Sequence, residues 1–171
     1  MLTAGVANVS ALAILLALTT FAAVFDMRHL RIPNGVAFAI LIAGLAASYL
    51  IGVVDPASAI AGATLGGGLL LAVRQAFRAL RGYDGLGLGD VKFVAAASTW
   101  TGLEGLPMML LVACIAALIF VGVCRIRDGA LDPLRRIPFG PFLGVGAALV
   151  GSVQMLSGLP FLDALDCFIP A

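Results

Sequence analysis

TAGVANVSALAILLALTTFAAVF, the segment from Thr3 to Phe25, contains no charged residue and ends directly before Asp26. About 20 apolar residues are enough for a helix to cross the hydrocarbon core of a bilayer. No Lys or Arg precedes this segment, and it is longer than the apolar region of a cleaved signal peptide. The segment therefore predicts a membrane-spanning helix that is retained in the mature protein.

The composition of the whole chain agrees with this first segment. Of the 171 residues, 62% are hydrophobic and only 11% are charged, whereas a soluble domain carries about 25% charged residues. A water-soluble fold could not hide so much apolar surface, so the chain is expected to be an integral membrane protein. Its net charge of +1 excludes a strongly basic nucleic-acid-binding protein.

Apolar runs between charged residues and turn residues predict an all-α, polytopic membrane protein with six transmembrane helices. The predicted spans are 3–25, 35–54, 58–73, 91–103, 107–124 and 139–157. The fourth span is short for a hydrocarbon core of about 30 Å. It either extends back through the glycines that precede it or lies inside the bundle, where other helices shield its ends. We expect residues 1–171 to form a single domain.

The charged residues predict the orientation of these spans. If the spans alternate in direction, one side of the membrane receives segments 26–34, 74–90 and 125–138, which contain every arginine, with Lys92 close by. The opposite side carries acidic residues and no Lys or Arg, namely Asp55, Glu104, Asp163 and Asp166. The positive-inside rule therefore predicts an inner-membrane protein with cytoplasmic arginine segments and both termini in the periplasm.

Small and basic residues in and beside the spans suggest two structural roles. Glycines four residues apart allow close helix packing in lipid, and the predicted spans contain two such pairs, Gly62 with Gly66 and Gly140 with Gly144. Three basic residues share one helical face where the third span leaves the membrane, and we expect them to anchor to lipid headgroups. They are Arg74, Arg78 and Arg81.

Two acidic residues lie at the membrane boundary and are candidates for a catalytic pair. Asp26 follows the first span and Asp90 opens the fourth, so alternation puts both carboxylates at the same membrane face and at similar depth. A charge at the hydrocarbon edge is costly and marks a functional candidate. Two close carboxylates cannot both ionise easily and should share a proton, as aspartic proteases use them. Alternatively, both residues merely mark solvated helix ends, with Asp90 near the positive end of its helix.

The residues around these aspartates resemble the motifs of one enzyme family. Phe25–Asn34 reads FDMRHLRIPN and is similar to the first active-site motif of bacterial type IV prepilin leader peptidases, an Asp followed seven residues later by Pro. Gly87–Lys92 reads GLGDVK and resembles their second motif, the GxGD signature also found in presenilin-like proteases. Ile137–Leu143 reads IPFGPFL and looks like the P-x-G-P segment that opens the last span of that family.

The resemblance implies a GxGD aspartic protease-like bundle with Asp26 and Asp90 as its catalytic pair. It further implies an endopeptidase that cuts the short basic leader from prepilins at the cytoplasmic membrane face, without a metal or an organic cofactor. The chain lacks the N-terminal extension and the paired C-x-x-C motifs of long bifunctional members, so N-methyltransferase activity is not expected. Its small size and its Arg-Ile-Pro-Asn sequence look most like the peptidases of Flp/Tad-type pilus systems.

Five further residues are candidates for substrate binding. Gly87 and Gly89 have no β-carbon, so a substrate backbone could lie close to the second aspartate. Pro33 and Asn34 belong to the first motif, although ending the loop and capping the second helix also explains them. Lys92 acts on a neighbouring carboxylate through its charge or extends to lipid headgroups.

The remaining polar residues of the arginine segments have simpler explanations. His29, the single histidine, is expected in a loop, either solvated or hydrogen-bonded to neighbouring backbone, and an acid/base role is the alternative. Three acidic residues are expected to pair with arginines in solvent or, alternatively, to guide a basic leader peptide. They are Asp84, Asp128 and Asp132.

Two other functions compete with the peptidase. A small transporter or proton-conducting protein could use Asp26 and Asp90 as an ion path, but it should also place ionisable residues at the membrane midplane, whereas the charges here lie near span ends. A structural subunit of a secretion assembly should show a damaged motif, and none is visible. The expected partners are a prepilin and the lipid bilayer, with no nucleic acid, and no oligomeric state is predicted.

Overall fold

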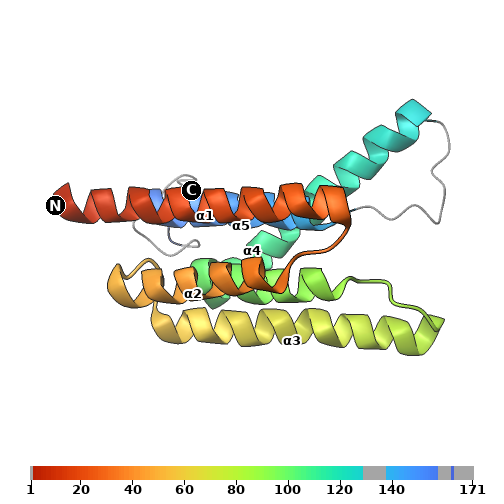
Figure 1. The fold of residues 1–171 in the computed structure, drawn as a ribbon, viewed down its shortest axis with the longest axis horizontal. Coiled ribbons are helices and arrows are strands. Elements are labelled where there is room, and N and C mark those ends of the chain that lie inside the picture. Colours follow the sequence, from red (N-terminus) through yellow and green to blue (C-terminus); the bar gives the residue numbers. More distant parts are fainter. Residues whose placement is uncertain (1, 129–137, 158–162, 164–171) are drawn as a thin grey trace.

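The computed structural model describes residues 2–128, 138–157 and 163, and all regular structure in these residues is helical. The five main helices are α1 (Leu2–His29), α2 (Asn34–Leu50), α3 (Pro56–Arg81), α4 (Leu88–Asp128) and α5 (Gly140–Ser157). Helix α4 packs against α2, α3 and α5, and α5 also packs along α1. Figure 1 shows α4 connecting the α1–α5 pair with the α2–α3 side of the bundle.

Gly102 divides α4 into two limbs, because its φ of 68° and ψ of −176° are not helical. The first limb starts beside the beginning of α5, since Asp90 and Phe139 line one cavity. The second limb runs antiparallel to α5, with Gly105 close to Val150 and, further along, Phe120 packed on Phe142. The two limbs therefore run in opposite directions, as Figure 1 shows.

This division corrects the loop that was predicted between the fourth and fifth spans. The predicted spans 91–103 and 107–124 lie in the two limbs of α4, which are separated by the non-helical Gly102. Glu104 and Pro107, which suggested a loop, lie within the second limb. The reversal needs no loop because glycine alone readily adopts this backbone conformation. Four of the described helices are long and apolar enough to cross a membrane, and α2 is a shorter apolar helix.

Two helices extend beyond their predicted ends. Helix α1 continues to His29, so Asp26 lies in its last turns and not after its end. Helix α3 continues to Arg81 and ends at Gly82, whose φ of 78° is left-handed. Both predicted spans stopped at the first charged residue, but a helix ends where its backbone is capped. The single helical face expected for Arg74, Arg78 and Arg81 already required helix beyond residue 73, and α3 bears this out. At α3 the Gly82 N–H donates to the Arg78 carbonyl oxygen at 2.8 Å.

Close contacts at glycine confirm the predicted packing role of the Gly62–Gly66 pair. A β-carbon added to Gly62 would lie 2.9 Å from the carbonyl carbon of Gly102, and one added to Gly66 would lie 3.0 Å from the Leu106 side chain. Helices α2 and α4 meet at the buried Trp100, whose indole N–H donates to the Ile40 carbonyl oxygen at 2.9 Å. These contacts fix the first limb of α4 between α2 and α3.

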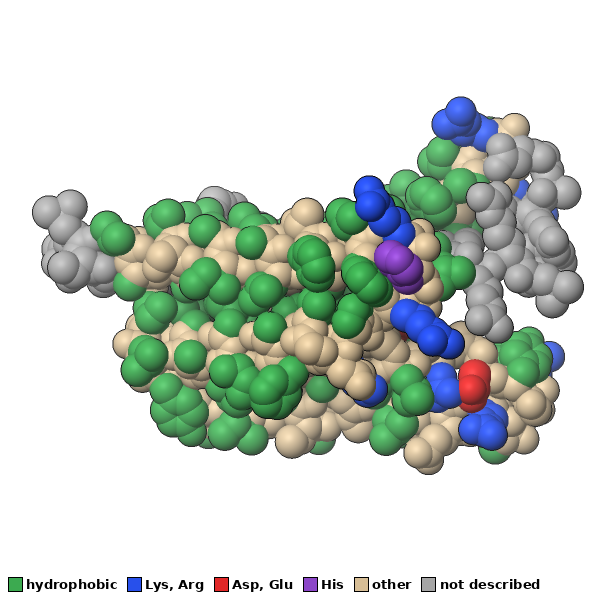
Figure 2. Space-filling model, viewed as in Figure 1, with side chains coloured by type: hydrophobic (Ala, Val, Ile, Leu, Met, Phe, Trp, Pro, Cys, Tyr) green, Lys and Arg blue, Asp and Glu red, His purple; other side chains and the backbone are tan. Residues whose placement is uncertain are grey.

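Charged side chains are divided between the two ends of the bundle. In Figure 2 the Lys and Arg side chains gather toward the end at which α1 stops. This end also receives the last turns of α3, the start of the first α4 limb and the start of α5. Asp55 and Glu104 lie at the other end, where α3 begins and α4 reverses. Asp132, Arg135, Arg136, Asp166 and Cys167 lie outside the described residues.

Candidate active site

One cavity at the basic end of the bundle contains both aspartates that were predicted to meet. It has a volume of about 840 Å³ and is lined by Asp26 from α1 and Asp90 from α4. Arg74 from α3 and Phe139, directly before α5, complete its walls. Because α4 starts at Leu88, Asp90 lies in the first helical turn, as predicted. Three helices and the segment before α5 thus contribute to one site through residues far apart in the sequence.

Asp26 is buried, with only 5% of its surface exposed. Its Oδ2 atom accepts a hydrogen bond from the backbone N–H of Gly140 at 3.0 Å. The predicted role of Gly140 was close helix packing, and the structure adds a hydrogen bond to the first candidate catalytic carboxylate. The sequence signal for this contact was the segment around Pro138 that resembles the third family motif.

Asp90 is partly buried, and the backbone amide of Gly87 hydrogen-bonds its carboxylate. The charges of Asp90 and Asp26 interact across the cavity. A β-carbon at Gly87 would lie 3.0 Å from the Asp90 Oδ2 atom, so glycine leaves this carboxylate unobstructed. Two carboxylates that face one cavity and influence each other can share a proton.

Gly89 has a close neighbour of its own. A β-carbon there would lie 3.2 Å from the backbone nitrogen of Ile32, in the segment that connects α1 to α2. This contact gives Gly89 a packing function between the first two motifs. Gly87 is exposed on the cavity wall. Contact of either glycine with a substrate stays a prediction.

The predicted capping role of Asn34 is wrong. Pro33 is the residue that precedes the first turn of α2, with φ −61° and ψ 140°, and no side chain caps this helix. The Asn34 Oδ1 atom instead accepts a hydrogen bond from Lys92 Nζ at 2.8 Å. The Asn34 side chain is thus engaged across the site, and Lys92 links the first motif to the second.

Arg74 has a role at the site that the sequence analysis missed. Its side chain is 13% exposed and pairs with Asp84 at 2.5 Å, and it also donates to the Leu86 carbonyl oxygen. Arg74 therefore binds the segment that leads into the second motif and does not face lipid headgroups, as had been predicted. Its only sequence signal was Asp84, whose predicted pairing with arginine is confirmed.

Arg78, one turn further along α3, behaves differently. It is 69% exposed and lies 3.9 Å from Asp84, a geometry that suits a surface residue. For the other two acidic residues that were expected to pair, the side chain of Asp128 and the whole of Asp132 lie outside the described parts of the chain.

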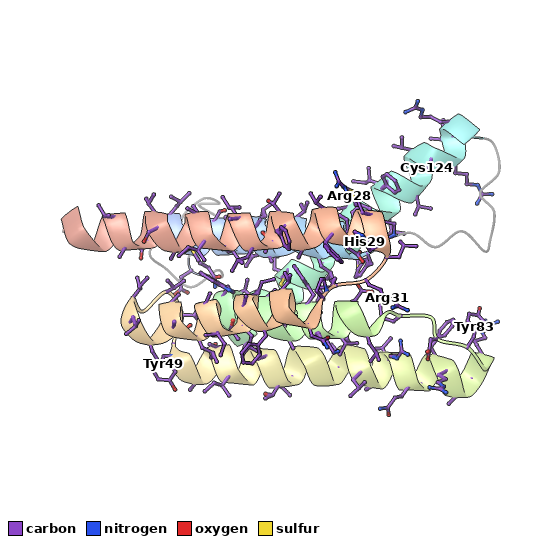
Figure 3. The ribbon with its side chains drawn as sticks, in the orientation of Figure 1. Arg28, His29, Arg31, Tyr49, Tyr83 and Cys124 are labelled. Atoms are coloured by element: carbon purple, nitrogen blue, oxygen red, sulfur yellow. The ribbon has the colours of Figure 1, made fainter. Side chains whose placement is uncertain are left out.

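His29 lies in α1 and not in a loop. Its Nδ1 atom is 3.2 Å from the Phe25 carbonyl oxygen, and its ring stacks on the Phe25 ring with 4.2 Å between centroids. The predicted hydrogen bond to neighbouring backbone is therefore confirmed, on a helix that continues past its predicted end. Figure 3 shows His29 and Arg28 at the end of α1 and Arg31 in the following segment. In the described part of the chain, no group of three or more His, Cys, Asp or Glu residues could hold a metal ion.

Comparison with known proteins relates this arrangement to one family. The model of the type IV leader peptidase family matches residues 13–122. The prepilin leader peptidase/N-methyltransferase of Burkholderia pseudomallei is 33% identical over 136 residues, which cover 80% of this chain and 42% of that protein. The corresponding protein of Aeromonas salmonicida is 33% identical over 134 residues, which cover 78% of this chain and 44% of that protein.

A shorter relative matches over most of its length. Leader peptidase HopD of Escherichia coli is 33% identical over 134 residues, which cover 78% of this chain and 86% of that protein. By contrast, the match covers less than half of the two longer relatives, 42% of the first and 44% of the second. No solved structure matches the chain significantly.

Proposed function

Because this chain belongs to the type IV leader peptidase family and is a multi-pass membrane protein, we propose that it is an aspartic endopeptidase with Asp26 and Asp90 as its catalytic pair. One observation carries the proposal: two carboxylates from different motifs line the same cavity and interact through their charges. The flanking residues support it, since the backbone amides of Gly140 and Gly87 each hydrogen-bond one carboxylate.

The proposed reaction needs one proton on the pair. The ionised carboxylate takes a proton from a water molecule as that water attacks the scissile carbonyl carbon, and the protonated carboxylate donates to the carbonyl oxygen. The proton taken from water then reaches the departing amine. The two aspartates supply both proton transfers, so the proposal requires no metal or organic cofactor.

We propose a prepilin as the substrate, with a short basic leader in front of a hydrophobic helix, and a Flp/Tad-type prepilin in particular. The position of the cavity supports this choice, because it lies at the end of long apolar helices, where a peptide held in the bilayer would emerge. Gly87 and Gly89 would let the substrate backbone approach Asp90, and Lys92 lines the same cavity. Pro33 and Asn34 do not line it; they would act through the segment after Ile32 and the Asn34–Lys92 hydrogen bond.

The proposed topology has six passes through the inner membrane, counting the two limbs of α4 separately, with the cavity on the cytoplasmic side. The separation of basic residues from Asp55 and Glu104 supports it. Arg78 and Ala57 are exposed and lie near opposite ends of α3. In a variant without the native cysteines, we expect Arg78→Cys to react with an impermeant thiol reagent only after the membrane is opened, and Ala57→Cys to react in intact cells without their outer membrane. Reaction of both in intact cells would refute this topology.

The activity is tested by co-expressing the chain with prepilins from the same genome and measuring pilin mass. We expect removal of the leader with the wild-type chain and none with Asp90→Asn at matched membrane levels. Cleavage by Asp90→Asn would refute the pair. An ion path is less well supported, since among the described residues Asp26 is the only buried charged residue and no line of ionisable groups crosses the bundle.

A further inference from the structure

The start of α5 has one backbone donor free for a side chain. The first N–H groups of any helix lack partners within the helix. In α5, Pro141 has no N–H, while Phe142 and Leu143 both donate to the Phe139 carbonyl oxygen, at 3.1 and 3.2 Å. The Gly140 N–H points away from this set and donates to Asp26 Oδ2 at 3.0 Å. The positive end of the α5 dipole faces the same carboxylate.

The missing side chain of Gly140 is as important as its N–H. A β-carbon there would lie 2.6 Å from Asp26 Oδ2 and 3.0 Å from its Cγ, too close for the carboxylate to keep its position. Gly144, one turn later on the same face, differs, because its added β-carbon would lie 3.5 Å from the nearest atom, the Thr19 carbonyl oxygen. The two glycines therefore separate contact with the carboxylate from ordinary packing of α1 on α5.

We propose that Gly140 is a positioning residue for Asp26: its N–H holds Oδ2, its lack of a side chain admits the carboxylate, and Oδ1 is left as the oxygen that exchanges a proton with water. This inference rests on the proposed peptidase function. The hydrogen bond from the Gly140 N–H favours negative charge on Oδ2, so we expect the proton of the pair to reside on Oδ1 or on Asp90. The roles of the two oxygens of Asp26 are thus set from α5.

The first test compares Gly140→Ala with Gly144→Ala as a matched pair. A displacement of about 1 Å at a catalytic group can lower the rate about 100-fold, so we expect kcat for prepilin cleavage to fall at least about 10-fold in Gly140→Ala with KM nearly unchanged. Gly144→Ala should keep both constants. Unchanged kcat in Gly140→Ala would overturn the inference, as would equal losses in both variants, because equal losses indicate packing alone.

The second test needs no activity and so separates failure of this inference from failure of the proposed function. Phe139–Gly140 is the only Phe-Gly pair in the sequence. Labelling Phe with carbonyl ¹³C and Gly with ¹⁵N therefore identifies the Gly140 amide by NMR in detergent micelles. We expect Asp26→Ala to shift its proton resonance upfield and Asp55→Ala, at the other end of the bundle, to leave it unchanged. A resonance unmoved by Asp26→Ala would overturn the inference even if the chain cuts prepilin.

Discussion

The two ends of the bundle use free backbone groups in opposite ways. At the cavity end, the N–H at the start of α5 donates to a carboxylate, Asp26, that lines the cavity. At the other end, the break at Gly102 frees groups that neutral side chains bind: the Leu103 N–H donates to Ser58 Oγ at 3.0 Å, and Gln154 Nε2 donates to the Thr101 carbonyl oxygen at 3.0 Å.

The two ends also differ in how closely protein atoms pack around these backbone groups. An added β-carbon at Gly102 would lie 2.6 Å from Val54 Cγ1 and 2.8 Å from Ser58 Oγ, so that end is filled by protein. The other end encloses a cavity of about 840 Å³ next to its carboxylates. A reversal of the chain inside a membrane requires satisfied backbone groups and close packing, whereas a hydrolytic site requires room for water and substrate. Substitutions at the two ends should therefore affect different properties.

The largest effect is expected at the cavity end. Asp26→Asn and Asp90→Asn should each abolish prepilin cleavage while the protein still accumulates, because an amide has a similar shape but cannot exchange the proton. The double variant should be no less active than either single variant, since the two residues act as a unit. Cleavage by purified protein should also persist in the presence of a metal chelator. Pilin mass, normalised to membrane protein level, is the measurement, and substantial residual cleavage in either single variant would contradict the pair.

The next largest effect is expected at the end of the bundle where α4 reverses at Gly102. It should lower stability and leave the catalytic rate unchanged. Gly102→Ala places a β-carbon at φ 68° and against Val54, so we expect membrane levels and thermal stability to fall while activity per folded molecule is kept. Gly122→Ala is the control, because a β-carbon there meets nothing within 4 Å. Equal membrane levels and melting temperatures for the two variants would contradict the proposal that this end of the bundle depends on close packing at Gly102.

A smaller effect distinguishes two arginines of α3. Arg74 binds Asp84 and the Leu86 carbonyl oxygen, so Arg74→Ala should loosen the segment before Asp90 and lower kcat several-fold. Arg78→Ala should change kcat little, since Arg78 is 69% exposed and 3.9 Å from Asp84, and exposed pairs contribute little. Kinetics of prepilin cleavage with both purified variants test this expectation. Equal losses would mean that general positive charge, and not the Arg74 contacts, matters.

The smallest effect is expected at the contact between the two motifs. Lys92→Met and Asn34→Ala should each alter cleavage by about twofold or less, because this hydrogen bond is exposed to solvent. The double variant should match the single ones, since both remove the same contact. A large loss in Lys92→Met alone would instead assign the ammonium group a direct role toward the carboxylates.

Properties that depend on neighbouring residues could be predicted from the sequence. Long uncharged runs such as Thr3–Phe25 predicted apolar helices, because backbone groups in a bilayer must bond within their own segment. The alternation of these helices was enough to predict that Asp26 and Asp90 share one end. The motifs around both aspartates also predicted the family, which the comparisons confirm. Helix ends were less accurate, since charge alone does not end a helix.

Contacts between distant segments could not be predicted from the sequence and are seen only in the packed bundle. Nothing near Gly102 in the sequence reveals that Ser58 and Gln154 bind the groups freed at the break, so the reversal of α4 was predicted as a loop. In the same way, the Arg74 contacts and the Gly140 hydrogen bond depend on how helices meet. The physical reason is that a local pattern specifies which surface of a helix is apolar, but a hydrogen-bond partner is specified only when the whole bundle packs.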